Sequence, residues 1–226
     1  MGIGTLNEGP LHAALKQHYL CLGGQEEVPV GDFVADVVCE DKIFEIQTGS
    51  FSGLNRKLDT LCQTNEVRLV HPVAQIKTIV KLGSDAKTII SKRRSPKRGH
   101  IWDILSELVY IPTMLGQRNF SVDVLLIEEN EYRVHDPKKV RRKGGWRVIE
   151  RELVSINDSL TIRSAKDLYE FFEEPLGEPF TSKEIELSMK CQPKIARQMA
   201  YVLRQLDLIE VIGKAGRFLN YRFKRR

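Results

Sequence analysis

Two strands, a helix and a third strand follow one another early in the chain, and this order most constrains the fold. In "GDFVADVVCEDKIFEIQTG", two apolar runs flank a polar turn at Glu40 and Asp41, which predicts a β-hairpin over residues 32–48. "SGLNRKLDTLCQ" spaces its leucines like a helix, and "EVRLVHPV" (66–73) reads as a buried strand. Two strands joined through a helix are typical of a parallel crossover. With a further helix over 8–22, the pattern predicts an α/β (α+β) fold, a mixed β-sheet flanked by helices.

The middle of the chain extends this sheet. "QIKTIVKLGSDAKTIISKRR" reads as a second hairpin that turns near Gly83. Residues 99–111 read as a helix, and residues 120–136 and 146–156 read as strands.

The C-terminal part has a different pattern, in which helical segments precede two short alternating runs. "TSKEIELSM" opens with a capping box of Thr181 and Glu184, and Pro193 stands in the first turn of the next helix. Three helices and a terminal hairpin predict a winged helix-turn-helix. The expected domains are a first domain over 1–160, with its core motif in 1–73 and an added hairpin, helix and strands in 74–160, and a winged-helix domain over 161–226.

The charge of the chain favours a polyanionic partner. The 226 residues carry a formal net charge of +5, with a pI near 9.0. Most of the excess lies in "SKRRSPKRGH" (91–100), "DPKKVRRKGGWR" (136–147) and "RFKRR" (222–226). Such runs are often solvated loops, but three of them in one chain favour nucleic acid, most simply DNA. With no membrane-length apolar run and no signal-peptide pattern, we expect a cytoplasmic protein without membrane contacts.

Three polar residues stand inside the apolar runs of the first hairpin. They are Asp36, Glu45 and Gln47. A symmetric turn places Asp36 opposite Glu45, and residues so opposed have Cβ atoms about 4.5–5.5 Å apart, where like charges repel. The pair therefore needs a cation, and Mg²⁺, which takes carboxylate oxygens, is a natural one.

A solvated face of the hairpin is the alternative explanation for these acids. Against it, Val34, Val38 and Ile43 share that face, and the register opposes Val38 and Ile43 and predicts both to be buried. Glu8 borders the apolar stripe of the first helix, so that helix can bring a third carboxylate to the same pocket. We favour a site.

This order of elements and residues resembles the PD-(D/E)XK nuclease superfamily. Asp36 in "VADVV" matches its metal-binding aspartate. Glu45 and Gln47 in "EIQ" match its Glu-x-Lys pair, and Glu8 matches the helical glutamate of Holliday junction resolvase-like members. The match covers residues 1–73 and implies a restriction endonuclease-like core.

Gln47 departs from that pattern, because the superfamily usually has a lysine there that helps to activate the attacking water. Some restriction endonucleases have Gln at this place, and other members take the lysine from the next helix, a role open to Lys57. The alternative for Lys57 is a surface residue opposite the leucine stripe. The resemblance implies metal-assisted phosphodiester hydrolysis, with Asp36, Glu45 and Glu8 holding Mg²⁺ or Mn²⁺ and Gln47 orienting the water.

Two basic loops and the winged helix are the parts predicted to bind DNA. The helix over 193–206 is the predicted recognition helix, and the loops are expected to contact the DNA backbone with a steep salt dependence. The predicted DNA-binding residues are Lys92, Arg93, Arg94, Lys97, Arg98, Lys138, Lys139, Arg141, Arg142, Lys143, Lys194, Arg197, Gln198, Arg204, Lys214 and Arg217.

Two other functions stay open. Gln47 also fits a non-catalytic DNA-binding or regulatory protein on a degenerate nuclease fold, which would bind DNA without cutting it, regardless of Mg²⁺. A winged helix that docks a protein partner would bind no DNA even at low salt. Because a duplex has two strands to cut, members of the superfamily often act as dimers, so a homodimer is open as well.

Overall fold

The computed structural model describes residues 8–20, 23–141 and 143–224, with Lys143 described by its backbone alone. The chain divides into two compact units. The first unit is Met1–Thr48, Val70–Ile101 and Val124–Leu160, and the second is Gly49–Leu69, Trp102–Asp123 and Thr161–Arg226. The α-helices are α1 (Pro10–Leu20), α2 (Asn55–Leu61), α3 (Leu105–Leu108), α4 (Ser182–Met189) and α5 (Pro193–Gln205). The 3₁₀ helices are η1 (Ile101–Ile104), η2 (Met114–Gly116), η3 (Lys143–Gly145) and η4 (Ala165–Phe171). The strands are β1 (Gln25–Val30), β2 (Phe33–Cys39), β3 (Lys42–Ile46), β4 (Glu66–Leu82), β5 (Ile89–Arg94), β6 (Phe120–His135), β7 (Trp146–Ile162), β8 (Ile209–Ala215) and β9 (Phe218–Phe223).

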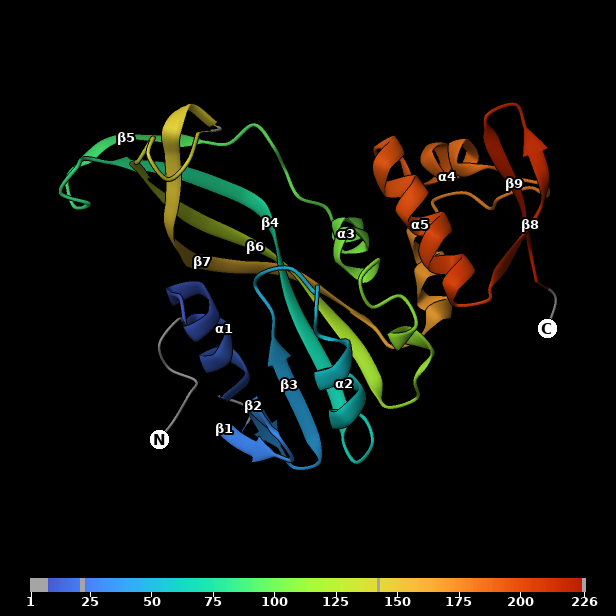
Figure 1. Cartoon of the computed structure of the whole chain (residues 1–226), viewed down its shortest axis with the longest axis horizontal. Coiled ribbons are helices and arrows are strands. Elements are labelled where there is room, and N and C mark those ends of the chain that lie inside the picture. The colour runs from blue at the N-terminus through green and yellow to red at the C-terminus, as the bar shows by residue number, and fades with distance from the viewer. Residues whose placement is uncertain (1–7, 21–22, 142, 225–226) are drawn as a thin grey trace. The chain divides into compact units, whose positions relative to one another are not determined.

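The described residues form a mixed sheet of seven strands and a small sheet of two strands, so the protein is α+β (Figure 1). The strand order of the large sheet is β1-β2-β3-β4-β6-β7, and β5 pairs with β4. β3 and β4 lie side by side and run in the same direction, with α2 between them in the chain (Figure 1). This is the crossover that the sequence predicts.

α1 packs on β1, β2 and β3 through one apolar stripe. The helix begins at Pro10. Proline is tolerated at this position because the N–H groups of the first turn have no hydrogen-bond partner within the helix, so the absence of an N–H costs nothing. Leu11, Leu15 and Tyr19 follow at intervals of four residues and are buried. They share the core of the first unit with Val37, Phe44, Ile46, Val70, Leu125 and Ile127.

The β2–β3 hairpin has the predicted register. Its backbone pairs are Val37–Phe44, Val38–Ile43 and Cys39–Lys42. Ile43 is fully buried and Val38 is half-buried, but Val34 is 49% exposed. The prediction that Val38 and Ile43 are both buried is therefore confirmed for Ile43 and wrong for Val38. Val34 is uncovered as well, since it lies beyond the last backbone pair with β3 at Val37.

The second unit contains the predicted capping box and the terminal hairpin. The hydroxyl of Thr181 accepts from the backbone N–H of Lys183 at 3.0 Å, and the Glu184 carboxylate accepts from the N–H of Thr181 at 2.8 Å. These bonds satisfy donors that the first turn of α4 leaves open. α5 opens with Pro193, as predicted, and β8 and β9 pair antiparallel.

Several elements differ from the sequence-based expectation. The strand expected over 66–73 and the first strand of the second hairpin form one continuous strand, β4. β1 was not expected, because its two glutamates and Pro29 lack the strand pattern; it is the edge of the sheet, where a proline is tolerated. The helix expected over 99–111 is a 3₁₀ turn followed by the four-residue α3. The helix expected after Ser164 is the 3₁₀ helix η4.

The described helices include none that is long and apolar enough to cross a membrane. The expected boundary near residue 160 stays a prediction. Thr161–Arg226 belongs to the second unit together with two earlier segments of the chain.

Candidate functional site

α1 brings charged side chains to the start of the β2–β3 hairpin. His12 and Lys16 are four residues apart and lie on one side of α1. Glu8 lies just before the helix, which begins at Pro10, so the expectation that Glu8 is helical is wrong. His12 lies between two carboxylates, with Nδ1 at 2.8 Å from Glu8 Oε1 and Nε2 at 3.3 Å from Asp36 Oδ2. Lys16 Nζ lies 2.9 Å from Glu8 Oε1 and 3.4 Å from Glu27 Oε1. We call Glu8, His12, Lys16 and Asp36 the α1 charge cluster.

In the α1 charge cluster, His12 and Lys16 pair with the carboxylates of Glu8 and Asp36. Burial lowers the pKa of His12, but the hydrogen bonds and charges of Asp36 and Glu8 outweigh burial and raise the pKa above its ordinary value. Both ring nitrogens can donate to carboxylates only when the ring is protonated. Burial likewise lowers the pKa of Lys16, but the hydrogen bonds and charges of Glu8, Glu27 and Asp36 together outweigh burial and raise the pKa above its ordinary value. For Glu8, burial raises the pKa, and Lys16 and His12 together bring it below the ordinary value.

Asp36 continues the β2–β3 pairing with its side chain. The backbone N–H of Ile46 donates to Asp36 Oδ2 at 2.8 Å, just beyond the last backbone pair, Val37–Phe44. Glu45, the neighbour of Ile46, is only 6% exposed. The two acids that the sequence opposes therefore stand at the end of the ladder, one tied to α1 and the other buried.

The backbone around Gln47 is held by three hydrogen bonds. The N–H of Gln47 donates to the carbonyl of Val70 at 2.9 Å, and the carbonyl of Gln47 accepts from His71 Nδ1 at 2.7 Å. Arg151 Nη1 donates to the carbonyl of Thr48 at 3.0 Å. Burial lowers the pKa of His71 to about 4; the bond to Gln47 opposes this shift and the charge of Arg151 adds to it. The neutral ring thus donates from Nδ1, and Gln47 extends from a fixed backbone.

Arg151 is itself held by Glu129, a carboxylate with no solvent exposure. Arg151 Nε and Nη2 lie 2.9 and 2.7 Å from Glu129 Oε2. Lys77 Nζ lies 2.9 Å from Glu129 Oε1 and 2.8 Å from Glu131 Oε2. A buried carboxylate requires such compensation, because burying an unpaired charge is very costly. This ion network therefore fixes the position of Arg151 and, through it, Thr48.

The residues of the site have the donor chemistry of a divalent metal site. Glu8, Asp36 and Glu45 supply carboxylate oxygens, which Mg²⁺ and Mn²⁺ prefer. In the present arrangement His12 lies between Glu8 and Asp36, so Lys16, and His12 when protonated, compensate these acids. Within 8–20, 23–141 and 143–224, no group of three or more His, Cys, Asp or Glu side chains is placed to hold a metal ion. The ligands fit in kind, and a metal between Glu8 and Asp36 would require the His12 ring to move.

Lys57 lies on α2, in the second unit, and is half-buried. Lys16, by contrast, belongs to the first unit and contacts Glu8 directly. Its own side chain is only 5% exposed. Lys16 is thus the lysine that the structure brings to the α1 charge cluster.

The two predicted basic loops are exposed parts of the first unit. Lys92, Arg93 and Arg94 form the end of β5, and Lys97 and Arg98 follow it. Lys138, Lys139 and Arg141 precede η3 and are exposed as well. Arg142 and the side chain of Lys143 lie outside the described residues.

α5 presents an exposed basic stripe, which belongs to the second unit. We call Lys194, Arg197, Tyr201 and Arg204 the α5 stripe; the four residues are exposed and three or four positions apart. The opposite stripe is buried and includes Ile195, Met199, Val202 and Leu203. The helix is therefore amphipathic, with a basic and aromatic outer side.

Gln198 and the turn between β8 and β9 complete the predicted contacts of this unit. Gln198 is half-buried, and its amide oxygen accepts from Ser106 Oγ at 3.2 Å. Lys214 and Arg217 are exposed at the β8–β9 turn, and the Arg217 guanidinium lies 5.1 Å from the ring centre of Phe218. Lys214 and Arg217 are therefore exposed to solvent, whereas Gln198 is hydrogen-bonded to Ser106.

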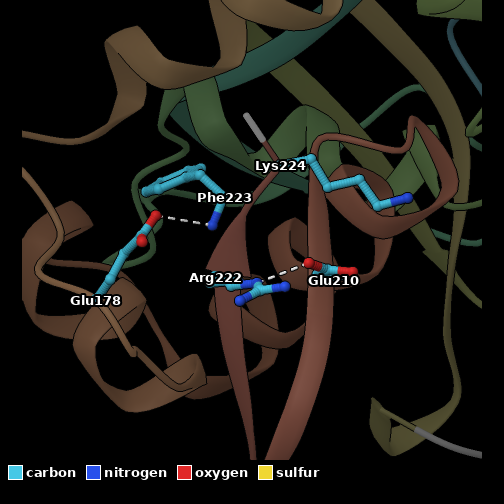
Figure 2. A pocket seen from close by; sticks show the side chains of 5 residues that line it. All are labelled: Glu178, Glu210, Arg222, Phe223 and Lys224. Atoms are coloured by element: carbon cyan, nitrogen blue, oxygen red, sulfur yellow. Dashed lines mark hydrogen bonds and ion pairs between the residues drawn. The ribbon is translucent and has the colours of Figure 1, made fainter. Parts of the chain in front are cut away.

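Two adjoining cavities lie beside the end of β9 in the second unit. Figure 2 shows the first, of about 530 Å³, lined by Glu178, Glu210, Arg222, Phe223 and Lys224. Arg222 Nε lies 2.7 Å from Glu210 Oε1, and the N–H of Phe223 donates to Glu178 Oε1 at 3.0 Å. The second, of about 630 Å³, shares Phe223 and Lys224 and adds Tyr169, Phe172, Glu173, Pro175 and Leu176. Acids and bases balance in the first cavity, so its charge selects no class of ligand.

Sequence reasoning missed several residues around the candidate site. They are His12, Lys16, His71, Glu129 and Arg151. For His12 and Lys16, which follow Glu8 by four and eight residues, this spacing was an available signal. For the other three no sequence signal exists, because their contacts join strands far apart in the chain.

The chain resembles proteins of unassigned function. The profile of a family described as "Domain of unknown function (DUF8091)" matches residues 9–163, which is more than half of the chain. An uncharacterized protein of Treponema pallidum (strain Nichols) is 29% identical over 186 residues, covering 82% of this chain and 74% of that protein. No solved structure matches the chain.

Proposed function

The chain belongs to the DUF8091 family, whose description states no function, and we propose that it is a metal-dependent endonuclease that hydrolyses phosphodiester bonds in DNA. One observation carries the proposal: His12 on α1 links Glu8 to Asp36, Lys16 on α1 pairs with Glu8, and the pairing of the β2–β3 hairpin runs towards Asp36 and Glu45. The order of β2, β3, α2 and β4 supports a restriction endonuclease-like core. The order of α4, α5, β8 and β9 supports a winged helix.

In this proposal each residue of the site has a distinct task. Asp36, Glu45 and Glu8 would hold the metal, and the metal when bound would polarise the scissile phosphate and acidify a water. The amide of Gln47 would orient that water from a backbone fixed by His71 and Arg151. Lys16 places a positive charge beside the carboxylates, where negative charge grows on the phosphate during hydrolysis.

DNA binding in this proposal comes from exposed cations in both units. In the first unit they lie on β5 and before η3, and in the second they form the α5 stripe and the β8–β9 turn. Tyr201 adds an aromatic ring to the α5 stripe, which suits a helix that contacts sugar and base edges. Phosphate contacts of this kind give affinity without fixing a base sequence.

A cleavage assay tests the proposal. The protein is incubated with supercoiled plasmid, linear duplex, single strand and a four-way junction in Mg²⁺ or Mn²⁺. Asp36→Asn and Glu45→Gln keep the size of the side chains and should abolish cutting. Asp41→Asn, at the exposed turn of the same hairpin, is the matched control and should cut like the wild type. Cutting that survives both site variants would exclude this site as the catalytic centre.

One observation favours a second candidate function, a DNA-binding protein that does not cut. Lys16, and His12 when it is protonated, compensate Glu8 and Asp36, so the charges of the cluster balance without a metal when the His12 ring is protonated. Such a protein would bind DNA equally with Mg²⁺ or EDTA, and Asp36→Asn would leave that binding unchanged. The same set of variants therefore separates the two functions.

A further inference from the structure

The hairpin of β4 and β5 carries two exposed isoleucines beside its basic residues. Ile89 is 60% exposed and Ile90 is 62% exposed, although both begin a strand. All six residues of β5 are exposed, so the strand contributes little to the core. Its partner residues in β4, Ile79, Val80 and Leu82, are buried. We call residues 78–94 the β4–β5 arm (Figure 1).

The tip of the β4–β5 arm is a firmly built turn. The N–H of Gly83 donates to the carbonyl of Thr88 at 2.8 Å. Asp85 Oδ1 accepts from the N–H groups of Lys87 and Thr88, each at 3.0 Å, and Oδ2 accepts from the Thr88 hydroxyl at 2.6 Å. These bonds hold the isoleucines in a defined place directly after the turn, so their exposure is a feature of an ordered segment.

A bulge sets the direction of the two isoleucines. Leu82 pairs with Ile89, but Lys81 pairs with Ser91, so Ile90 is an extra residue in β5. Bulges increase the local twist and re-aim side chains. The bulge thus lies at the point where two large apolar side chains stand in solvent.

The surroundings of the isoleucines indicate a polyanion. Between 83 and 98 the chain has six cations, Lys87, Lys92, Arg93, Arg94, Lys97 and Arg98, and one acid, Asp85. A membrane surface or a second copy of the chain also covers apolar groups, but a second copy would bring the same positive charges together. DNA offers phosphates to the cations and stacked bases to the apolar tip. Proteins that enter the minor groove insert isoleucine and similar side chains between base steps and bend the duplex.

We propose that the β4–β5 arm enters the minor groove of bound DNA and that Ile89 and Ile90 press against one base step and bend the duplex there. This inference rests on the proposed DNA binding but not on cleavage. The cations of β5 hold the flanking phosphates, and the two isoleucines supply the wedge. Flexible pyrimidine–purine steps such as TA should be preferred, because they unstack most easily.

The test measures bending in EDTA, where no metal-dependent cutting occurs. A 30-bp duplex with one central TA step carries a donor and an acceptor dye at its ends and 2-aminopurine at the step. The wild type should raise the energy transfer and the 2-aminopurine fluorescence. The Ile89→Ser/Ile90→Ser protein should lose both signals and about tenfold in affinity for this duplex. Val154→Ser, at an exposed apolar site on β7 (51%), is the control and should behave like the wild type.

Each outcome decides between named alternatives. Full bending by the double variant would overturn the inference and leave DNA binding standing. Loss of a dimer, or of binding to anionic vesicles, in place of lost bending would assign the isoleucines to a second copy or a membrane. A wild type that binds no DNA would overturn both this inference and the proposed function. Netropsin, which occupies the minor groove, should compete with the arm, and a lack of competition would also count against it. Matching thermal unfolding of the three proteins checks that they are folded.

Discussion

The side chains around Gln47 show how buried charge can fix a backbone. Glu129 is fully buried and has two cationic partners, Lys77 and Arg151. Arg151 spans from Glu129 to the carbonyl of Thr48, so one guanidinium joins β7 to the end of β3. Breaking such a network is costly because it leaves a buried charge without a partner.

Arg151→Ala should lower the free energy of unfolding by about 3–5 kcal/mol, because Glu129 then keeps a buried charge with one cation fewer. Glu129→Gln in the same chain should restore part of the loss, since the remaining amide is neutral. Arg141→Ala, at an exposed position, is the control and should stay within about 0.5 kcal/mol of the wild type. Urea unfolding measures all three, and an equal loss from Arg141→Ala and Arg151→Ala would contradict the role of the network.

His71 should make stability fall in mild acid. Its pKa is about 4 in the folded chain and about 6.5 when unfolded, so between these values the unfolded state binds a proton that the folded state rejects. Stability is therefore complete above pH 6.5 and falls by about 3 kcal/mol towards pH 4. His71→Gln keeps a donor for Gln47 and does not titrate. Subtracting its pH–stability curve from that of the wild type should isolate this fall, and a flat difference would refute the assignment.

Helix ends and hairpin turns are predictable from sequence where a few neighbouring residues determine them. The capping box before α4 was predictable because it needs only Thr181 and Glu184 at a spacing of three. The β2–β3 register was predictable because its polar turn is symmetric and its side chains alternate. β1 was not, since an edge strand tolerates Pro29 and exposed glutamates.

The candidate site was predictable only in part. Asp36, Glu45 and Gln47 stand out from sequence because polar residues interrupt apolar runs. The contact of Lys16 with Glu8 depends on which side of α1 faces the hairpin, and Leu11, Leu15 and Tyr19 fix that side. The role of Arg151 depends on the pairing of β6 and β7, which no short motif encodes.

Thr181→Ala should destabilise the second unit by about 1 kcal/mol, because α4 loses the side-chain acceptor for its first turn. Thr181→Ser keeps the hydroxyl and should recover most of the loss. Thermal unfolding followed by circular dichroism measures the difference. Equal melting of the Ala and Ser variants would show that the cap contributes nothing.

Removing the charges of β5 should reduce the salt dependence of DNA binding. Neutralising Lys92, Arg93 and Arg94 together should lower the slope of log affinity against log salt by about 0.9 for each DNA phosphate that these cations no longer neutralise. Lys166→Ala, an exposed cation outside the basic loops, is the control and should leave the slope unchanged. Fluorescence anisotropy across a salt series measures the slope, and an unchanged slope in the triple variant would remove β5 from the DNA-binding surface.

At the scale of the whole molecule, the two units interleave along the chain. The second unit takes in Gly49–Leu69 and Trp102–Asp123 as well as Thr161–Arg226. Within it, α3 packs against α5, with Leu105 and Leu108 fully buried. A short sequence pattern does not reveal such interleaving, because it records neighbours in sequence and not in space.

A fragment that ends at residue 160 should therefore not behave as a finished domain. Without α5, Leu105 and Leu108 become partly uncovered, and we expect the fragment to bind the dye ANS and to unfold with reduced cooperativity. The full chain at the same concentration is the control. A fragment that melts in one sharp transition without binding the dye would support the domain boundary predicted from sequence.

The basic residues of β5 have a consequence for protease sensitivity. Trypsin cuts after Lys and Arg, and the exposed run from Lys92 to Arg98 offers it five such residues, beginning on a strand that adds little to the core. Free protein should therefore be nicked first in this run, and saturating DNA should slow that nick. The order of tryptic fragments thus becomes a footprint of the bound state that requires neither a dye nor knowledge of the preferred DNA.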